Sequence, residues 1–491
     1  MNNPKKEDFR LQVTVKSENL QIENIPCKVY LPKRVTDPIS LEFHPDEQKG
    51  ISLLPLFDGA IYGEVKDISG AVSRQIHATK VYFSNKREQT WGDGSEISLT
   101  GTPRDLTITT FFGHSKDRNP DRPTTGSFWL TPSEMLSPDQ ILHPSSTGEV
   151  TIETRGRKQF ILENNVCLSF NKHFHYVTGD NNDLVTFSEL VAEYEITGTT
   201  ENHEKVILDS LGDLDDFLLV ASFAASQPCV CLGWESVKST EFTKHYRRDR
   251  IIPPMMEESK RTSPLIDISE FEDFIQSAYR HFIDFEAKGF LRRALGILVF
   301  QYGRNISEGS FLSLYSALET LILWFRGKFD LENILPDDQW PQFQKDFEKW
   351  LKSHPSFSQN SEKRKHLYEN VRGLNHISLS SAFTRFCNDL SVYTQDLWPV
   401  FGNTEGASLS LIRNKLIHGV PLDPRQIKSL IPVYVHLRTL VERSILALFQ
   451  WPIENSRVYT GATDDYGGEN WREERKILSQ AFLDLPELPG S

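Results

Sequence analysis

Residues 9–200 alternate apolar and polar positions with the period of two that is typical of β-strands. One run places apolar side chains at Phe9, Leu11, Val13 and Val15, and another at Leu106, Ile108 and Phe112. Turn residues separate such runs, and the polar, proline-containing segments at 115–125 and 131–148 are predicted to be long loops. The pattern predicts an N-terminal antiparallel β-rich domain of sandwich or barrel-like form, with one helix at 211–226.

After residue 262 the apolar positions recur with the period of an α-helix. The strongest pattern lies at 310–326, where one face would carry Phe311, Leu314, Tyr315, Leu318, Leu321, Ile322 and Phe325. Several shorter helices are expected on either side of it, which predicts an all-α helical bundle. Pro253 and Pro254, with the charged residues after them, are typical of a linker, so we place the domain boundary near residue 262.

The chain is therefore expected to be an α+β multidomain protein with three segments. Residues 1–262 would form the β-rich domain, 263–455 the helical domain, and 456–491 an acidic, polar tail with a short amphipathic helix. The last helix of the bundle should begin with Asp423 as its N-cap. Pro432 lies inside that helix and predicts a kink or a break.

The segment 409–419, with the sequence L-S-L-I-R-N-K-L-I-H-G, combines a helical apolar stripe with polar residues suited to chemistry. Its apolar stripe is Leu409, Ile412 and Leu416. Gly419 permits a positive φ and Pro421 cannot continue a helix, so the pattern predicts that the helix ends there.

Arg413, Asn414 and His418 lie off this stripe, with about 140° between Arg413 and His418 on a helical wheel. Asn414 and His418 are one turn apart, so the Asn414 carboxamide is expected to hydrogen-bond the imidazole. The helix dipole favours a charged histidine at a C-terminus, which suits general acid–base chemistry. Ile417 is apolar on a face that should be wet, so this face is expected to meet a partner, and a second copy of the helix is one candidate.

The sequence R-N-K-L-I-H at 413–418 resembles the R-x4-H motif, often written R-N-x-x-x-H, of the HEPN superfamily. Proteins of this superfamily have α-helical domains, and many of them are metal-independent ribonucleases that act as dimers. The C-terminal half resembles the ApeA-like HEPN domain. The N-terminal half resembles the domain paired with it among bacterial anti-phage defence proteins. A capping histidine beside a surface arginine is the alternative explanation of the same residues.

The resemblance implies an endoribonuclease in which the RNA 2′-hydroxyl is the nucleophile. His418 would act as general acid or base, Arg413 would hold the phosphate and stabilise the transition state, and Asn414 would orient His418 or the phosphate. Two copies across a two-fold axis, with Ile417 at their interface, would supply base, acid and positive charge without a metal. Some HEPN ribonucleases place an acidic residue near the motif; Glu319 is the candidate, with an exposed helix-edge glutamate as the alternative.

Basic residues outside these roles are candidates for contacts with RNA. They are Lys415 in the motif, Lys363, Arg364 and Lys365 at the start of a helix, and Arg247 and Arg248 near the linker. A charge run is more often a solvated face, so each of these has that alternative. The formal net charge of the chain is −13, so an RNA site would be a local basic patch rather than a field of the whole molecule.

Composition limits the other classes of function. The five cysteines are scattered and do not form the pattern of a disulfide framework. The sequence has no signal-peptide core and no apolar run of membrane length, so a cytoplasmic protein with no membrane partner is expected. The pairs Cys229-x-Cys231 and His173-x-His175 each lack a second well-spaced pair, so neither a metal nor a cofactor is expected.

The sequence leads to the hypothesis of a metal-independent HEPN endoribonuclease that acts as a homodimer on cellular RNA, with tRNA one candidate target. The resemblance implies a role in abortive infection, where the activity is toxic to its own cell and is restrained or triggered through the β-rich domain by a phage-encoded partner. A non-catalytic dimeric HEPN scaffold that binds RNA or a nucleotide is one alternative. A ligand- or carbohydrate-binding β-sandwich with a helical oligomerisation domain is another.

Overall fold

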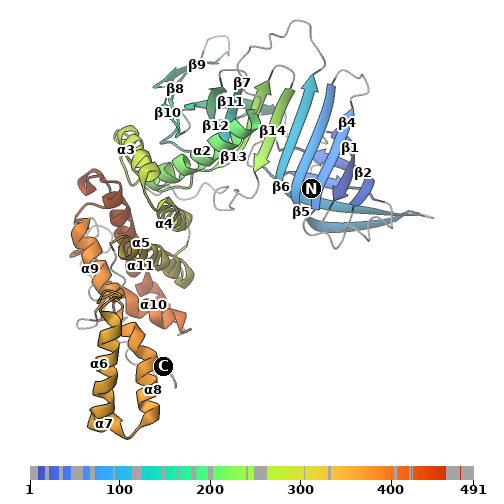
Figure 1. Cartoon of the computed structure of the whole chain (residues 1–491). Coiled ribbons are helices and arrows are strands. Elements are labelled where there is room, and N and C mark those ends of the chain that lie inside the picture. The colour runs from blue at the N-terminus through green and yellow to red at the C-terminus, as the bar shows by residue number, and fades with distance from the viewer. Residues whose placement is uncertain are drawn as a thin grey trace. The chain divides into compact units, whose positions relative to one another are not determined.

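The computed structural model of the chain (Figure 1) has two compact units, Met1–Thr262 and Ser263–Ser491, which we call the β unit and the helical unit. The expected combination of a large antiparallel sheet with helices is confirmed. The structure describes residues 9–16, 21–32, 37–45, 59–66, 72–91, 94–112, 124–144, 150–156, 158–163, 166–178, 184–196, 203–238, 241–247, 263–302, 305–329, 333–402, 406–419, 422, 424–460 and 476. Among these residues, no helix has both the length and the apolar character needed to cross a membrane.

The β unit contains β1 (Phe9–Lys16), β2 (Gln21–Tyr30), β3 (Ser40–Phe43), β4 (Gly59–Lys66), β5 (Val72–Trp91), β6 (Gly94–Phe112), β7 (Thr124–Leu130), β8 (Asp139–Pro144), β9 (Val150–Arg155), β10 (Gln159–Ile161), β11 (Cys167–Thr178), β12 (Leu184–Ile196), β13 (Cys231–Lys238) and β14 (Glu241–Arg247). In the described part of the chain, the main sheet has 12 strands in the order β10-β11-β12-β7-β13-β14-β6-β3-β2-β1-β4-β5. β5 also pairs with β6, so β6, β3, β2, β1, β4 and β5 close into a ring. The other strands continue from β6 as an open sheet (Figure 1).

The period-two pattern of the sequence decides which side chains fill this ring. Leu11, Val13 and Val15 of β1 are buried, whereas Gln12 and Lys16 between and after them are exposed. The buried side chains belong to one core cluster that also contains Ile25, Val29, Leu41 and Phe43 from β2 and β3. A register shift of one residue would turn these apolar side chains outward, so the alternation fixes the register of each strand. The loop expected at 131–148 is partly wrong, because β8 lies within it and pairs with β9.

The helix expected at 211–226 is confirmed, but α2 begins earlier and spans His203–Ala225. Its buried face includes Leu214, Phe217, Leu218, Ala221 and Phe223. The helix contacts β13, and Phe217 packs against Phe160 and Phe170 with ring centroids 5.0 and 5.8 Å away. α2 therefore contributes apolar side chains to the core beside the open part of the sheet.

The helical unit contains α3 (Phe271–Asp284), α4 (Lys288–Gln301), α5 (Glu308–Lys328), α6 (Trp340–Ser353), α7 (Pro355–Ser358), α8 (Ser361–Val371), α9 (Leu379–Asp389), α10 (Leu409–Ile417) and α11 (Pro424–Leu448), with short 3-10 helices η2 (Arg372–Asn375) and η3 (Ile453–Asn455). α5 lies at the centre, in contact with α4, α9, α10 and α11. All the apolar residues predicted for its face are buried. It begins with a capping box in which Ser307 and Ser310 each satisfy a backbone N–H of the other.

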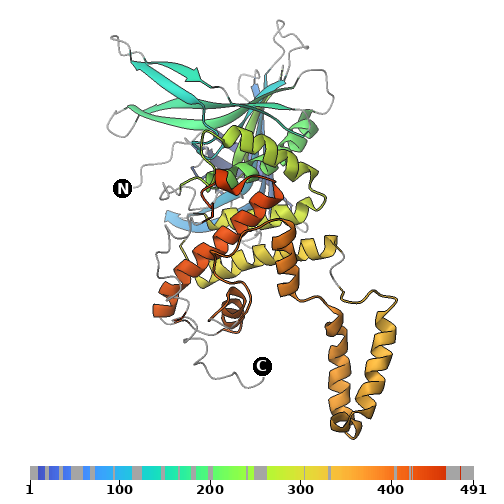
Figure 2. The ribbon, with the colours of Figure 1, turned by 90° about the vertical axis from the view of Figure 1, so that its left-hand side faces the viewer.

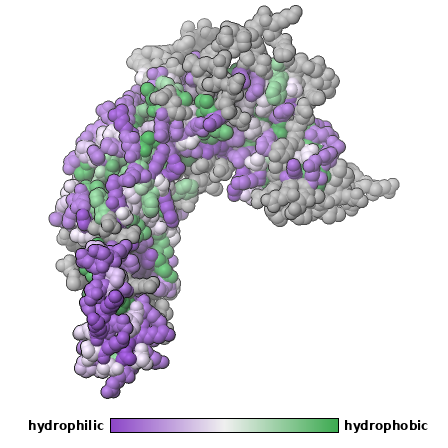
Figure 3. All heavy atoms as spheres, viewed as in Figure 1, coloured by the Kyte–Doolittle hydropathy of each residue, from purple (hydrophilic) through white to green (hydrophobic). Residues whose placement is uncertain are grey.

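Helices α6 and α8, joined by α7, lie side by side as a hairpin that extends from the other helices (Figure 1 and Figure 2). Leu351 and Val371 are the buried residues of these helices, and the outer surface in Figure 3 is mostly hydrophilic. The rings of Trp340, Phe343, Phe347 and Trp350 form a stacked row, with neighbouring centroids 5.2, 6.1 and 5.7 Å apart. The hairpin therefore has little apolar core of its own, and the aromatic row lies along α6 with Phe343 and Trp350 42% and 49% exposed.

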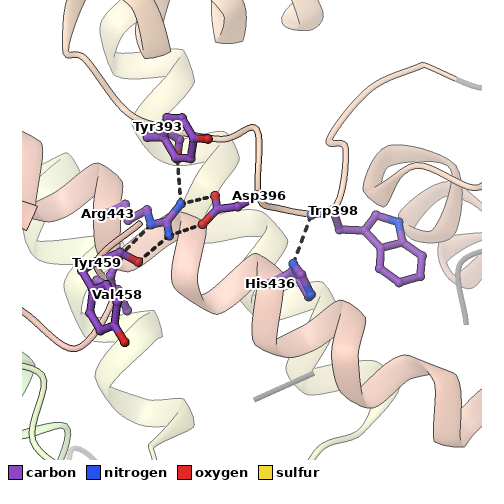
Figure 4. Close-up of polar contacts among 7 residues, drawn as sticks. All are labelled: Tyr393, Asp396, Trp398, His436, Arg443, Val458 and Tyr459. Atoms are coloured by element: carbon purple, nitrogen blue, oxygen red, sulfur yellow. Dashed lines mark hydrogen bonds and ion pairs between the residues drawn. The ribbon is translucent and has the colours of Figure 1, made fainter. Parts of the chain in front are cut away.

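A buried ion pair ties α11 to two other segments of the helical unit (Figure 4). Both terminal nitrogens of Arg443 donate to the Asp396 carboxylate, at 2.6 and 2.8 Å. The remaining donors reach the backbone carbonyls of Tyr393, Val458 and Tyr459 at 2.9 to 3.0 Å. Because every donor of this buried guanidinium has an acceptor, the arrangement avoids the cost of an unpaired buried charge.

The segment after Asp396 leads directly to the helix that carries the motif. The backbone N–H of Trp398 donates to Nδ1 of His436 on α11 at 3.2 Å, and the Trp398 indole N–H donates to the Ala407 carbonyl at 2.8 Å. The N–H groups of Leu409 and Ser410 then donate to the carbonyls of residues 399 and 400. These hydrogen bonds fix the start of α10 against α11.

Two expectations for the last helix have different outcomes. Of the kink or break expected at Pro432, the break is wrong, because α11 is one helix from Pro424 to Leu448 with Pro432 inside it. Proline removes one backbone hydrogen bond, and the buried contacts on both sides of it, including Leu430, Val433 and Leu437, hold the helix in place. The N-cap expected at Asp423 and the amphipathic helix expected in the tail lie outside the described residues.

Candidate functional site

The motif segment forms α10, and its limits follow from local sequence. The Ser408 side chain caps the helix by accepting a hydrogen bond from the Leu411 N–H at 3.3 Å. The stripe Leu409, Ile412 and Leu416 is buried, as predicted. Gly419 has φ of 72°, a conformation that favours glycine, and its N–H donates to the Leu416 carbonyl at 3.0 Å. The predicted end of the helix is therefore confirmed.

Arg413 is held by side chains from α5 and from its own helix. One terminal nitrogen lies 3.4 Å from a carboxylate oxygen of Glu319, and the other donates to Oδ1 of Asn414 at 3.0 Å. The guanidinium carbon lies 5.9 Å from the centroid of the Tyr315 ring. The structure thus brings together Arg413 and Glu319, two of the residues that the sequence nominated, and adds Tyr315 to them.

Burial and charge set the strength of these contacts. The side chains of Arg413 and Glu319 are 33% and 25% exposed, so their ion pair is partly screened by water and contributes about 1 kcal/mol or less. Tyr315 is buried, which raises the pKa of its hydroxyl. Glu319 raises that pKa further and Arg413 opposes it, and the net effect keeps the phenol protonated at neutral pH.

His418 is the C-cap residue of α10, and its side chain is exposed. Its backbone N–H donates to the Asn414 carbonyl at 3.1 Å. The expected side-chain hydrogen bond from Asn414 to His418 is absent among the described residues. The Asn414 carboxamide oxygen instead accepts a charge-assisted hydrogen bond from Arg413. The imidazole therefore faces solvent and is accessible to a substrate.

Exposed apolar side chains occur on the helices that carry or contact the motif. Ile417 is 52% exposed, so this apolar side chain lies on the wet face of α10, as the sequence predicts. Leu323 on α5 and Ile427 and Ile431 on α11 are also exposed, by 46, 49 and 48%. α5 contacts both α10 and α11, so these side chains come from helices that pack together.

The basic residues nominated for RNA contacts have different environments. Lys415 is half-buried, and Lys363 and Lys365 are exposed at the start of α8. Lys365 lies 4.0 Å from Glu369, an exposed pair of little energetic weight. Arg364 instead donates to the carbonyls of Phe357 and Ser358 at 2.5 and 2.6 Å, which ties α8 to the end of α7. Lys363 and Lys365 therefore remain accessible, whereas Arg364 has a structural contact.

The placement of Arg247 contradicts its nomination as an RNA-binding residue. It is 8% exposed, and its terminal nitrogens donate to both carboxylate oxygens of Asp215 on α2, at 2.9 and 2.8 Å. Burial alone would lower its pKa, but the hydrogen bonds and charge of Asp215 outweigh burial and raise it. The sequence could not show this, because the two residues are distant in the chain. Arg248 lies outside the described residues.

The cysteine and histidine pairs that were considered as metal ligands can be judged by their burial and their neighbours. Cys229 and Cys231 are both buried, and burial raises the pKa of each thiol to about 11. His173 lies 3.0 Å from Glu193 on the neighbouring strand. Within the described ranges, no three His, Cys, Asp or Glu side chains come together as a group that could hold a metal ion.

Two residues of the site, Tyr315 and Ser408, are not among the functional residues predicted from the sequence. Tyr315 was assigned only to the apolar face of α5, although it stands four residues before Glu319 and so shares its face. Ser408 was not recognised as the N-cap, although a serine directly before an apolar-periodic run is the usual signal. Both signals are present in the sequence.

Comparison with known proteins adds little to this picture. No family model and no curated protein matches the chain. Among solved structures, a similarity is found to MrkH, described as a novel c-di-GMP dependence transcription regulatory factor. The match has 7% sequence identity, covers 42% of this chain and 86% of that chain, and has a TM-score of 0.11. That score is too low to indicate a shared fold.

Proposed function

We propose that this chain is an endoribonuclease of the HEPN type, with the helical unit as its HEPN domain. The observation that carries the proposal is the arrangement on α10. Arg413 is held by Glu319 and Asn414, and His418 stands exposed at the end of the same helix. A fixed guanidinium suits a phosphate, and an accessible imidazole suits proton transfer.

The proposed reaction needs a base, an acid and positive charge. The base takes the proton of the RNA 2′-hydroxyl, whose oxygen then forms a bond to the adjacent phosphorus. The bond from phosphorus to the 5′-oxygen breaks, and the acid donates a proton to that oxygen. The products are a 2′,3′-cyclic phosphate and a 5′-hydroxyl. Guanidinium groups stabilise the negative charge that develops on the phosphoryl oxygens.

A single α10 supplies one His418 and one Arg413, whereas the reaction uses two proton-transfer groups. We therefore propose a homodimer in which two copies of α10 face each other across a two-fold axis. The exposed Ile417 beside His418 supports this arrangement, because an apolar side chain at that position gains from contact with its own copy. Lys415, Lys363 and Lys365 are the proposed contacts to the RNA backbone.

The β unit is proposed to restrain this activity, or to release it in response to a phage-encoded partner, in abortive infection by phage. The need to hold a toxic nuclease in check motivates this role. Cells that express residues 263–491 alone should be more strongly inhibited in growth than cells that express the full chain. A folded, dimeric fragment that is neither toxic nor changed in activity would count against restraint.

The proposed reaction is tested with purified full chain, total cellular RNA and EDTA. We expect discrete RNA fragments that end in a 2′,3′-cyclic phosphate. A matching RNA with methylated 2′-oxygens should remain uncut, because it has no 2′-hydroxyl to attack. Fragments with a 3′-hydroxyl, or cleavage of the methylated RNA, would contradict the mechanism. Binding of RNA by a dimer that never cuts it, even with a phage lysate added, would favour a non-catalytic scaffold.

A further inference from the structure

We propose that Tyr315 is a positioning residue for Arg413, and that its ring fixes the plane in which the guanidinium receives an RNA phosphate. This inference rests on the proposed ribonuclease function, in which Arg413 holds the phosphate. Tyr315 thereby joins Glu319 and Asn414 as a third side chain that holds Arg413. This positioning role goes beyond filling the core of the helical unit.

The first support is the placement of the ring. Tyr315 is 2% exposed, and its ring packs against that of Phe311 one turn earlier, with centroids 6.2 Å apart. The ring is therefore held in place by the core of α5. The guanidinium carbon of Arg413 lies 5.9 Å from its centroid, within the distance of about 6 Å at which a cation is attracted to an aromatic face.

The second support is the set of contacts around the guanidinium. Tyr315 and Glu319 are one helical turn apart on α5, and both meet Arg413 on α10. Glu319 lies beside one terminal nitrogen, and Asn414 accepts from the other. Within the part of the chain that the structure describes, Nε of Arg413 has no hydrogen bond. The guanidinium is thus fixed at both ends while N–H donors remain for a phosphate.

The third support is the charge state of the phenol. A tyrosine phenol is neutral at physiological pH, and burial with the nearby Glu319 carboxylate raises the pKa of Tyr315 still further. A neutral phenol keeps its π face towards the cation without adding a second negative charge to that of Glu319. The phosphate of an RNA substrate therefore meets a guanidinium that a single carboxylate partly neutralises.

Substitutions of Tyr315 can distinguish the proposed positioning role from a purely structural role in the core. Tyr315→Phe keeps the ring and loses the hydroxyl, whereas Tyr315→Leu keeps an apolar side chain and loses the ring. Phe325→Leu is the matched control, because it removes a buried ring of the same helix that contacts Phe329 and Phe386 rather than Arg413. If Tyr315 only fills the core, Tyr315→Leu and Phe325→Leu should lower stability and leave the activity of each folded molecule unchanged.

The experiment measures three quantities in the full-length variants. The guanidinium resonance of Arg413, identified in isotope-labelled protein by its loss in Arg413→Lys, reports the ring contact through its ring-current shift. Fluorescence anisotropy of a short random-sequence RNA with methylated 2′-oxygens reports binding without cleavage. Cleavage of total cellular RNA, divided by the folded fraction, reports activity.

We expect Tyr315→Phe to keep the ring-current shift and wild-type cleavage. Tyr315→Leu should lose the shift, bind the methylated RNA about fivefold more weakly and cut at least about fivefold more slowly, the loss expected for one cation–π contact. Phe325→Leu should match the wild type in the ring-current shift, in RNA binding and in cleavage.

Two results would overturn the inference. One is the absence of the ring-current shift in the wild type, and the other is unchanged binding and cleavage in Tyr315→Leu. If the wild type cuts no RNA even with a phage lysate added, the proposed function fails. The ring-current shift and the binding data then still decide whether Tyr315 positions Arg413.

Discussion

Glu319 and Arg413 form an ion pair between the central helix α5 and the motif helix α10, with 3.4 Å between carboxylate oxygen and guanidinium nitrogen. The two residues are 94 positions apart in the sequence, as their numbers give, and neither is fully buried. Asn414 holds the other end of the guanidinium at 3.0 Å. The pair therefore links the helix that organises the unit to the helix that carries the proposed chemistry.

Glu319→Gln should lower RNA cleavage about fivefold without changing the fold, because it removes one charged contact of a partly exposed pair. Cleavage rates and circular dichroism spectra measure the two effects. Glu272→Gln is the matched control, since Glu272 is an exposed glutamate on α3, a helix that carries none of the proposed RNA contacts. Faster cleavage by Glu319→Gln would instead mean that Glu319 competes with the phosphate for Arg413.

Ile417→Asp should weaken the proposed homodimer at least about tenfold, because a carboxylate would have to leave water when the two copies meet. Analytical ultracentrifugation over a range of concentrations measures the dissociation constant. Ile334→Asp is the control, because Ile334 is 61% exposed in the same unit but lies outside the motif helix, and its dimer should match the wild type. A dimer unaffected by Ile417→Asp would place the interface elsewhere.

Asp396→Asn should lower the free energy of unfolding by about 3 to 5 kcal/mol, because it leaves the buried charge of Arg443 without a counter-charge. Chemical denaturation measures this change. The matched control is Asp389→Asn, which breaks the ion pair with Arg385; those side chains are 42% and 52% exposed, and the cost should be within about 1 kcal/mol. Equal effects of the two substitutions would contradict the role given to burial.

Stability should fall as the pH falls from about 6.5 to about 4, owing to His436 on α11. Burial lowers the pKa of this histidine from 6.5 to about 4; Asp396 opposes that effect and Arg443 adds to it. Between these values the unfolded chain binds a proton that the folded chain does not, so stability is full above pH 6.5 and decreases by up to about 3 kcal/mol on acidification.

His436→Asn is the variant that tests this pH dependence. Asparagine keeps an acceptor for the Trp398 N–H but does not titrate, so the decrease in the free energy of unfolding between pH 6.5 and 4 should be smaller than in the wild type. Denaturation at several pH values compares the two proteins. Parallel curves would show that other groups control acid stability.

The helices that frame the site could be predicted because their signals are local. The stripe Leu409, Ile412 and Leu416 and the stop at Gly419 depend on neighbours in sequence, and both agree with the structure. The same holds for the buried face of α5. Periodicity and end signals act over a few residues, so a single chain reveals them.

The partners of individual polar side chains could not be predicted in the same way. Asn414 was expected beside His418 and instead binds Arg413, and Arg247 was expected at the surface and instead binds Asp215. Such choices depend on which charges meet after the chain folds. The ring likewise closes only when β5 pairs with β6 and the strands β1 to β6 all find their partners. The alternation of apolar and polar residues does not specify which strands pair.

The most direct test of the proposed ribonuclease is cleavage of total cellular RNA, in EDTA, by purified wild type, His418→Ala and His366→Ala. His366 is an exposed histidine on α8 of the same unit, so its substitution controls for the loss of a surface imidazole. Oligomer size is measured on the same samples. We expect cleavage by the wild type and His366→Ala, none by His418→Ala, and the same dimer in all three. Equal cleavage by His418→Ala and the wild type would contradict the assignment of the site.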